Sequence, residues 1–465
     1  MALTNEDREL LREIRQRLKD EPLKPGNALY EPIYEVPGVD DPVARLQVNI
    51  EGPESLQLFS GFRGSGKTTE LYRLQQRLEA EGAFVLYADA QEYLNPAEPV
   101  DVASLLMAIA GGFSDALEGV LGVNQARESF WKRITHYLTT TLVVVEGADV
   151  ALETESVAKE ILGGLKAGVE VKLALKDAPS FRQKLAQFLE NRLPKLKEEA
   201  NRFIGEAVKA IRARKGPDTR VVFIFDQLEQ IRGTLTTEVS VIQSVERVFA
   251  THLHLLKLPL VHCIYTVPPW LRFVVPGALT IEVVPTIHLW NNDEGRTQSE
   301  PGWETMRRLL GKRFPPGGLP RVFGADPSAS QALLDRLIAN CGGHIRDLQR
   351  LLRELIVRIQ TQSRTLPVTA ELVERAIEEV RAQYLPLALE DARWLAEIAK
   401  HRAAVLQSVA PDQVSRLSRF LDTHFVLYFS NAKKWYDIHP LIREEVARLA
   451  PPPPAAGTNT SAAAP

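Results

Sequence analysis

One loop, Gly61 to Thr68, constrains this chain more than any other segment. Its sequence, GFRGSGKT, matches the pattern G-x-x-x-x-G-K-[ST]. The loop follows an apolar run, SLQLFS, and precedes leucines at helical spacing. In that context the glycines let backbone N–H groups point inward, and the positive end of the following helix faces the same point. The loop is therefore predicted to bind a polyphosphate.

The side chains of this loop have predicted roles. We expect the Lys67 amine to reach the β- and γ-phosphates and the Thr68 hydroxyl to ligate Mg²⁺. No guanine-selecting N-K-x-D motif occurs, so ATP is the expected nucleotide. A glycine-rich turn without a ligand is the alternative interpretation. The residues predicted to bind the cofactor are Gly61, Arg63, Gly64, Ser65, Gly66, Lys67, Thr68 and Thr69.

A second apolar run, VVFIF, ends in the carboxylate of Asp226. In open α/β sheets ligands bind at the carboxyl ends of the strands, which would place Asp226 beside Thr68. We therefore predict that Asp226 and Thr68 hold the metal ion together, as the Walker B and Walker A elements of ATPases do. The alternative is that Asp226 caps the next helix.

Glu229 is the candidate general base that would polarise the attacking water. In many ATPases the base directly follows the first aspartate, and Gln227 occupies that position here. We therefore expect slow hydrolysis or a displaced base. An acid in the first turn of a helix, stabilised by the helix dipole, is the alternative for Glu229.

Two more residues are candidates for sensing the γ-phosphate. Thr266 ends the apolar run LVHCIYT, and Arg346 opens a helix after a Gly-Gly pair. A threonine that merely closes a strand, and an arginine in a surface salt bridge, are the alternatives. Arg232 and Arg272 are the candidates for an arginine finger, and no motif supports either.

Apolar spacing predicts strands that alternate with helices up to about residue 290, at 55–60, 83–88, 220–225, 259–266 and 281–289. The predicted helices are 6–19, one from about 42, 70–81 and a long one that ends at Lys257. This alternation predicts a parallel sheet with helices on both faces. Between these elements, 101–216 has mainly helical periodicity, although VEVKLALK (169–176) alternates as a strand would.

Beyond residue 303 the pattern is helical, near 303–313, 328–340, 344–361 and 369–383. Residues 411–449 then run helix, strand (424–429), turn (Ser430–Asn431), strand (435–438) and helix, which is typical of a winged-helix-like module. The predicted fold class is α/β, with a parallel P-loop NTPase sheet, a large helical insertion, an all-α lid and a C-terminal winged-helix-like domain. The predicted units are 1–40 (helix and linker), 41–300 (nucleotide domain, with 101–216 as the insertion), 301–385 (lid), 386–450 (winged-helix-like) and 451–465 (disordered tail).

Composition narrows the function classes. In the 465 residues, 56 Lys and Arg face 59 Asp and Glu, and this net charge of −3 argues against a strongly basic nucleic-acid coat protein. Cys263 and Cys341 have no metal-binding spacing and predict a reducing compartment. The N-terminus lacks the apolar core of a signal peptide, and the apolar stretch 258–279 is interrupted by charge and proline. We expect a cytoplasmic protein that does not bind membranes.

Several weaker signals leave alternatives open. Lys433, Lys434 and Trp435 on the predicted wing could contact a DNA backbone, although a solvated hairpin tip is commoner. His252 and His254 do not share a helix face, so we expect no metal site there. A helix cap is the favoured role of His439, which precedes a proline.

The segments GFRGSGKTTEL, FIFDQLEQ, IYT and CGGHIRDL occur in the order found in AAA+ ATPases of the origin-recognition type, and they resemble the related STAND signalling ATPases. The segment FVLYFSNAKKWYDIHPLIRE looks like the winged-helix end of such bacterial ATPases. The resemblance covers about 40–90, 218–290 and 303–449, but not the 101–216 block. It implies Mg-ATP binding, sensor 1 at Thr266, sensor 2 at Arg346 and a regulatory switch.

Three functions are consistent with these sequence features. A molecular switch would couple ATP to the position of the lid and wing, and would act with an effector protein or as a homo-oligomer. A DNA-binding loader or transposition-type ATPase is the second hypothesis. A metabolic P-loop kinase ranks last, because it would hardly need a sensor-bearing lid and a winged module.

Overall fold

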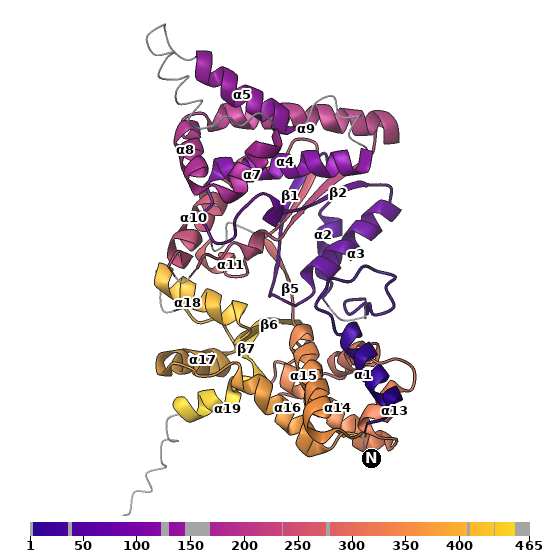
Figure 1. The fold of residues 1–465 in the computed structure, drawn as a ribbon. Coiled ribbons are helices and arrows are strands. Elements are labelled where there is room, and N and C mark those ends of the chain that lie inside the picture. Colours follow the sequence, from indigo (N-terminus) through magenta and orange to yellow (C-terminus); the bar gives the residue numbers. More distant parts are fainter. Residues whose placement is uncertain are drawn as a thin grey trace, which may run out of the picture.

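The computed structural model describes residues 3–35, 40–121, 130–144, 168–234, 236–275, 280–406, 410–431 and 433–451. A central sheet separates two helical regions (Figure 1). The helices of the 101–216 block lie at one end of the sheet, and the lid and the C-terminal module lie at the other. Apart from Pro451, the predicted tail falls outside the described residues.

The central sheet has five strands, all parallel, in the order β2-β3-β4-β1-β5. Their bounds are β1 Ser55–Gly61, β2 Phe84–Asp89, β3 Val221–Asp226, β4 His262–Thr266 and β5 Ile281–Val284. These strands confirm the predicted α/β class. The last two are shorter than predicted, because β4 begins after a turn at 259–260 and β5 ends before Pro285.

The register of the strands brings the predicted site residues to one edge. Asp89 at the end of β2 pairs with Asp226 at the end of β3. Phe59, near the end of β1, pairs with Thr266 at the end of β4. Because β4 lies between β3 and β1, the loop after β1, Asp226 and Thr266 share the carboxyl edge of the sheet.

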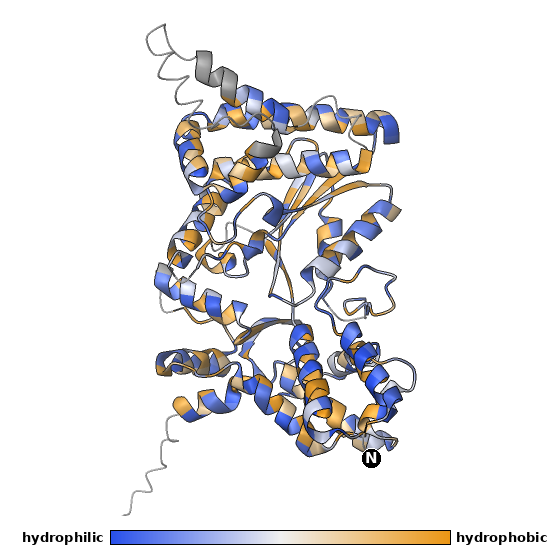
Figure 2. Ribbon diagram, viewed as in Figure 1, coloured by the Kyte–Doolittle hydropathy of each residue, from blue (hydrophilic) through white to orange (hydrophobic). Residues whose placement is uncertain are grey.

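Helices cover both faces of the sheet, and residue alternation shows which face each one takes. A Cβ on Gly112 of α4 (Val102–Leu121) would lie 3.0 Å from the Phe225 ring and 3.2 Å from Ala88. Tyr72 of α3 (Lys67–Ala80) instead faces Tyr87, the neighbour of Ala88 in β2, at 5.4 Å between ring centroids. Side chains of successive strand residues point to opposite faces, so α3 and α4 lie on opposite sides. The strands between them are among the most apolar parts of the ribbon (Figure 2).

The described part of the 101–216 block is helical, as predicted. It comprises α4, α5 (Phe130–Val144), α7 (Gly168–Asp177), α8 (Pro179–Leu189) and α9 (Leu193–Lys215). The ambiguous segment 169–176 is therefore helix. α4 also belongs to the nucleotide-domain core, because its Phe113 packs edge-on against Phe223 of β3.

α4 is the one helix among the described residues that is long and apolar enough to cross a membrane by length and composition. The sequence prediction had considered only the stretch 258–279. In α4, 67% of the apolar window is buried inside the protein, against the sheet and α9. Such burial is typical of a core helix in a folded domain.

The long helix predicted after Asp226 is wrong. Gln227 adopts a left-handed conformation (φ 71°), and only a 3-10 turn, Leu228–Gln230, follows it. The helix α10 begins at Glu238 and ends at Thr251, and a second 3-10 turn covers Leu253–Leu256. This break directs the residues after β3 back toward the edge of the sheet.

The lid contains the predicted helices and one more. Its helices are α12 (Glu300–Gly311), α13 (Gly318–Phe323), α14 (Pro327–Cys341), α15 (Ile345–Arg358) and α16 (Ala370–Ala382). The short helix α13 was not predicted, because its six residues give no clear period. Before the sheet, α1 (Asn5–Arg17) packs on α15, and α2 (Pro42–Val48) packs on α3. A four-residue helix, α11 (Leu271–Val274), follows β4.

The C-terminal module has the predicted order and one additional helix, α17 (Leu389–His401). α18 (Pro411–Asp422), β6 (Val426–Asn431), β7 (Lys433–Ile438) and α19 (Pro440–Leu449) follow. The predicted turn at Ser430–Asn431 is wrong, because both residues are in β6 and Asn431 pairs with Lys433. The antiparallel hairpin β6–β7 docks on the nucleotide domain, where the Thr286 N–H donates to the Tyr428 carbonyl (2.8 Å).

Candidate functional site

The loop between β1 and α3 has the backbone of a phosphate cradle. Gly64 and Gly66 take positive φ angles of 82° and 93°, which side chains disfavour. α3 begins at Lys67, directly after Gly66, so its positive end faces the loop. The Ser65 hydroxyl is buried and has no hydrogen-bond partner among the described residues. An unpartnered buried donor in this position fits an anionic ligand.

Lys67 and Glu229 form a buried ion pair at the centre of the site. The Lys67 Nζ lies 3.0 Å from a carboxylate oxygen of Glu229, and the side chains are 6% and 3% exposed. Burial by itself raises the pKa of Glu229, but Lys67 and a hydrogen bond from Thr266 outweigh burial and leave the pKa below its ordinary value. Glu229 is therefore an ionised partner of Lys67.

The left-handed Gln227 explains why Glu229 reaches this position. The reversal after Asp226 turns the chain into the 3-10 turn, and Glu229 then returns to the strand edge. Its second carboxylate oxygen is buried without a hydrogen-bond partner in the described part of the chain. A free acceptor beside Lys67 is what a base that orients water requires.

Thr68 and Asp226 meet as predicted. The Thr68 hydroxyl donates to Asp226 Oδ2 at 2.8 Å, so an ion could bind both oxygens with small adjustments. Burial, followed by the negative charge of Glu229, raises the pKa of Asp226. This oxygen-only donor set fits Mg²⁺, whose charge would restore the ionised form of the carboxylate.

Tyr87 is a site residue that the sequence analysis missed. Its hydroxyl donates to the same Asp226 oxygen at 2.5 Å. Burial and the charge of Asp226 raise the pKa of Tyr87, which keeps this phenol a donor. The available signal was its place in the strand before Asp89, since β2 ends at the same sheet edge as β3.

Thr266 lies where the topology predicted, at the end of β4 and next to β3. Its hydroxyl oxygen accepts from the Leu228 N–H at 3.0 Å, and it also contacts Glu229. Thr266 is fully buried. It therefore fixes the turn that presents Glu229, in addition to any contact with phosphate.

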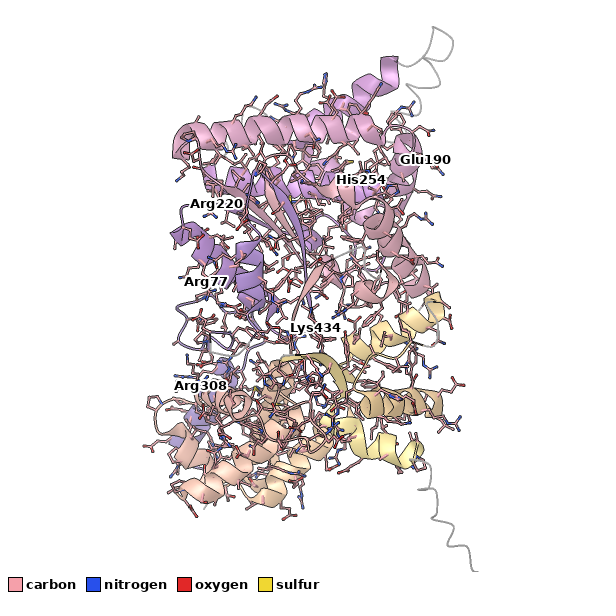
Figure 3. All side chains as sticks on the ribbon, turned by 180° about the vertical axis from the view of Figure 1, so that it is seen from behind. Arg77, Glu190, Arg220, His254, Arg308 and Lys434 are labelled. Atoms are coloured by element: carbon pink, nitrogen blue, oxygen red, sulfur yellow. The ribbon has the colours of Figure 1, made fainter. Side chains whose placement is uncertain are left out.

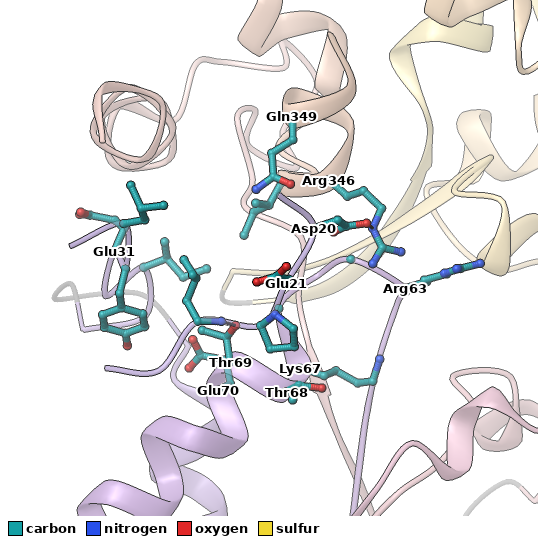
Figure 4. A pocket seen from close by; sticks show the side chains of 18 of the residues that line it. Asp20, Glu21, Glu31, Arg63, Lys67, Thr68, Thr69, Glu70, Arg346 and Gln349 are labelled. Atoms are coloured by element: carbon teal, nitrogen blue, oxygen red, sulfur yellow. Dashed lines mark hydrogen bonds and ion pairs between the residues drawn. The ribbon is translucent and has the colours of Figure 1, made fainter. Parts of the chain in front are cut away.

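Arg346, the second residue of α15, lies directly over the phosphate loop. A Cβ built on Gly64 would be 2.6 Å from the Arg346 Cβ, so glycine is required there by contact as well as by φ. The Arg346 Nε lies 2.7 Å from an Asp20 oxygen. Figure 4 shows Arg346 beside Asp20, on the same cavity as Lys67 and Thr68.

The N-terminal segment supplies one wall of this cavity, although the sequence analysis assigned it only as a linker. The cavity has a volume of about 350 Å³. The Leu23 N–H donates to the Thr69 hydroxyl (3.1 Å), and Arg313 of the lid donates to the Leu29 carbonyl (2.7 Å). Its walls include apolar side chains that could pack against a base, those of Leu23, Leu29, Ile33, Leu309 and Ile345.

The two candidate arginine fingers make contacts within the chain. Arg232 lies 3.3 Å from Asp422 of α18, and Arg272 lies over the Tyr428 ring at 5.5 Å. Both arginines therefore join the nucleotide domain to the C-terminal module. Arg63, at the tip of the phosphate loop, is exposed.

The predicted wing is only partly available to a nucleic acid. Trp435 is 4% exposed and stacks on Phe429 with a centroid distance of 4.3 Å, so it belongs to the hairpin core. Lys433 and Lys434 are exposed, and Figure 3 shows Lys434 where the hairpin meets the nucleotide domain. His439 caps α19 as predicted, because its Nδ1 accepts from the Leu441 N–H at 3.2 Å.

Comparisons with known proteins bear on the fold. No family model and no curated protein matches the sequence. Among solved structures, the chain is similar to a Walker-type ATPase of Pyrococcus abyssi, with 11% identity over 88% of this chain and 94% of that one and a TM-score of 0.36. It is also similar to the ORC2 protein of Aeropyrum pernix in its ADP form, with 10% identity over 92% of this chain and 98% of that one and a TM-score of 0.37. A third similar structure is Cdc6p of Pyrobaculum aerophilum, with 12% identity over 91% of this chain and 97% of that one and a TM-score of 0.30.

The strand order and the elements around the sheet define the fold. The parallel order β2-β3-β4-β1-β5 places the loop after β1 between helix α3 and the acidic end of β3. Helices flank the sheet, and an all-α lid and a hairpin-bearing C-terminal module follow it. The chain has the α/β fold of a P-loop NTPase, with the ORC2 and Cdc6p proteins among the solved structures that it resembles.

Proposed function

We propose that this chain is an ATP-binding regulatory switch of the AAA+ and STAND kind, which hydrolyses ATP slowly and acts with an effector protein or a second copy. One observation carries the proposal: Lys67 of the nucleotide domain and Arg346 of the lid line one cavity, and Tyr428 of the C-terminal hairpin lies against Phe62 of the phosphate loop. A ligand that binds Lys67 and Arg346 together would favour one lid position over another.

The proposed roles follow the predicted ones. Lys67 would neutralise the β- and γ-phosphates, and the loop amides would hold their oxygens. When bound at Thr68 and Asp226, Mg²⁺ would supply the positive charge that stabilises the leaving phosphate. Glu229 would orient the attacking water, and Thr266 would hold Glu229 in place. Arg346 would then report the γ-phosphate to the lid.

The buried Lys67–Glu229 pair supports slow turnover. A triphosphate must compete with Glu229 for the Lys67 ammonium, and an acid paired with this lysine is a poor base until the phosphate takes its place. The candidate fingers Arg232 and Arg272 are engaged within the chain, and an arginine finger is worth about 10³–10⁵ in rate. A partner or second copy would supply the missing group, and a cytoplasmic location is part of this proposal.

The proposal is tested by ATP binding to Lys67→Ala. We expect binding at least about 100-fold weaker, which is roughly 3 kcal/mol, because the triphosphate loses its buried counter-charge. Calorimetry with Mg-ATP measures this, with the exposed Lys215→Ala as control and thermal melting to confirm folding. Unchanged affinity in a folded Lys67→Ala protein would show that the nucleotide binds elsewhere.

A DNA-binding AAA+ ATPase is the second candidate, supported by the exposed Lys433 and Lys434. Backbone binding to duplex DNA would weaken steeply as salt rises. We expect no such binding at physiological salt. Salt-sensitive binding that is lost on replacing both lysines would favour the loader hypothesis over the switch.

A further inference from the structure

A buried cluster of histidines and one aspartate joins three parts of this molecule that are distant in sequence. His344 and Asp347 belong to the start of α15, next to Arg346 of the lid. His424 precedes β6 and His439 follows β7, so both belong to the C-terminal module. The four side chains are at most 7% exposed. The nucleotide site described above uses none of them.

The three histidine side chains converge on a single oxygen of Asp347. Asp347 Oδ2 lies 2.7 Å from His344 Nδ1, 3.2 Å from His424 Nδ1 and 3.4 Å from His439 Nε2. One ligating atom from each of His344, Asp347 and His424 lies within 4.8 Å of the others. The His344 and His424 rings are 4.0 Å apart between centroids.

The hydrogen bonds around the cluster decide which nitrogens carry protons. His344 Nε2 lies 3.0 Å from the Arg63 carbonyl, which can only accept, so Nε2 carries the proton. His344 Nδ1 lies 2.7 Å from Asp347 Oδ2, so these two atoms need a cation or a shared proton between them.

The remaining contacts match the surroundings of a bound metal. A metal-ligating histidine usually donates its other N–H to a backbone carbonyl, as His344 does to Arg63. Ligating carboxylates are themselves held by donors, and Arg350 donates to Asp347 Oδ1 at 2.8 Å. His439 accepts the Leu441 N–H at Nδ1, and its Nε2 lies 3.4 Å from Asp347 Oδ2, beside the cluster.

We propose that His344, Asp347 and His424 form a binding site for a divalent cation of the zinc type, with His439 and Arg350 orienting the carboxylate. Two imidazoles and one carboxylate supply three of the four positions that Zn²⁺ usually has, and mixed nitrogen and oxygen ligands suit this ion. The ion would join α15 of the lid to the C-terminal module. Through His344 it would also connect this junction to the backbone of the phosphate loop.

The test is metal binding by the full-length protein, measured without nucleotide. The chain is purified without chelators or a metal-affinity tag, and its zinc content is measured by mass spectrometry. Chelator-treated protein is then titrated with Co²⁺, whose visible absorption reports its ligands directly. We expect about one equivalent of metal per chain and a Co²⁺ spectrum that Zn²⁺ abolishes. Because neither measurement involves ATP, the proposal can fail while the proposed nucleotide function stands.

Variants separate a metal ligand from a structural histidine. His424→Gln should weaken Co²⁺ binding by more than about 100-fold and remove its absorption, because even outer partners are worth about 10–100-fold. His439→Ala should weaken Co²⁺ binding by only about 10–100-fold. The matched control is His401→Ala, since His401 lies in the same module and is 52% exposed.

Two results would overturn the site. The first is wild-type protein that carries no metal and gives no Co²⁺ absorption, which would mean that no metal ion binds between His344, Asp347 and His424. The second is a Co²⁺ spectrum that persists in folded His424→Gln. If that variant does not fold, the wild-type measurement alone decides.

Discussion

The residues around Lys67 show how charge is balanced at the edge of the sheet. Lys67, Asp226 and Glu229 are all buried. The Lys67 ammonium contacts Glu229, and the hydroxyls of Thr68 and Tyr87 donate to Asp226. The pKa of Asp226 is raised, because burial and the charge of Glu229 outweigh the attraction of Lys67. The pKa of Glu229 is lowered, because Lys67 and Thr266 outweigh burial. With two carboxylates and one ammonium, the site has one carboxylate whose charge a divalent cation could balance.

Glu229→Gln should strengthen ATP binding while it slows hydrolysis. The amide keeps the size of the side chain but no longer holds Lys67 by charge, so the phosphates gain the ammonium without competition. We expect affinity to rise about tenfold, which is about 1.4 kcal/mol, and turnover to fall. Calorimetry and phosphate release measure the two effects, with the exposed Glu92→Gln as control. Weaker binding in Glu229→Gln would contradict the competition.

The buried carboxyl group of Asp422 in α18 should make the stability of the protein depend on pH. Burial raises its pKa to about 6, from an ordinary value of 3.8, against the opposing charges of Arg232 and Lys67. Between these values the folded protein binds more protons than the unfolded chain, so the free energy of unfolding falls as pH rises. Two pKa units correspond to at most about 3 kcal/mol.

Denaturant unfolding between pH 4 and 7 measures this contribution as the difference between wild type and Asp422→Asn. The wild type should lose stability relative to the variant as pH rises through about 6. If the free energy of unfolding changed with pH in the same way in both proteins, Asp422 would not be the cause of the pH dependence.

At the scale of elements, the β6–β7 hairpin joins the C-terminal module to the nucleotide domain by side-chain packing. Trp435 and Phe429 stack on one side of it, and the Tyr428 ring on the other lies 6.4 Å from Phe62 of the phosphate loop. Alternation along the strands explains both contacts, because neighbouring residues point to opposite faces. The hairpin therefore has an apolar core of its own and a face fitted to the nucleotide domain.

Trp435→Ala should destabilise the C-terminal module by about 3–5 kcal/mol, because it leaves a cavity beside Phe429. The exposed Lys434→Ala is the matched control and should change stability by less than about 0.5 kcal/mol. Thermal and denaturant unfolding check both. A stable Trp435→Ala protein that loses only DNA binding would instead support the predicted DNA contact.

At the scale of the whole molecule, three units meet at the phosphate loop. The lid reaches it through Arg346 over Gly64 and through His344 on the Arg63 carbonyl. The C-terminal module reaches it through Tyr428, whose ring lies 6.4 Å from that of Phe62. A change in the loop therefore has direct contacts through which to move both units.

Mg-ATP should slow backbone hydrogen exchange in α15 and in the β6–β7 hairpin, which lie outside the phosphate loop. The expected cause is that the γ-phosphate holds Arg346 and fixes the lid against the hairpin. Exchange is followed by mass spectrometry with and without Mg-ATP. Arg346→Ala should still bind nucleotide but lose this protection, whereas the exposed Arg375→Ala should keep it. Protection confined to the loop would refute the coupling.

The sequence alone determined the order and approximate place of the strands, the phosphate loop and the meeting of Thr68 with Asp226. Local patterns specify these features: apolar runs mark buried strands, and parallel strands bring their ends to one edge. It did not reveal that Gln227 would break the helix expected after β3, because a left-handed non-glycine residue leaves no pattern.

Tertiary structure alone decided the rest. It brought residues 20–33 over the cavity, placed Tyr87 on Asp226 and buried Trp435 in the hairpin. It also gathered His344, His424 and His439 around Asp347. These contacts join residues that are far apart along the chain or on different strands. They form only when the chain has folded, and no spacing in the sequence records them.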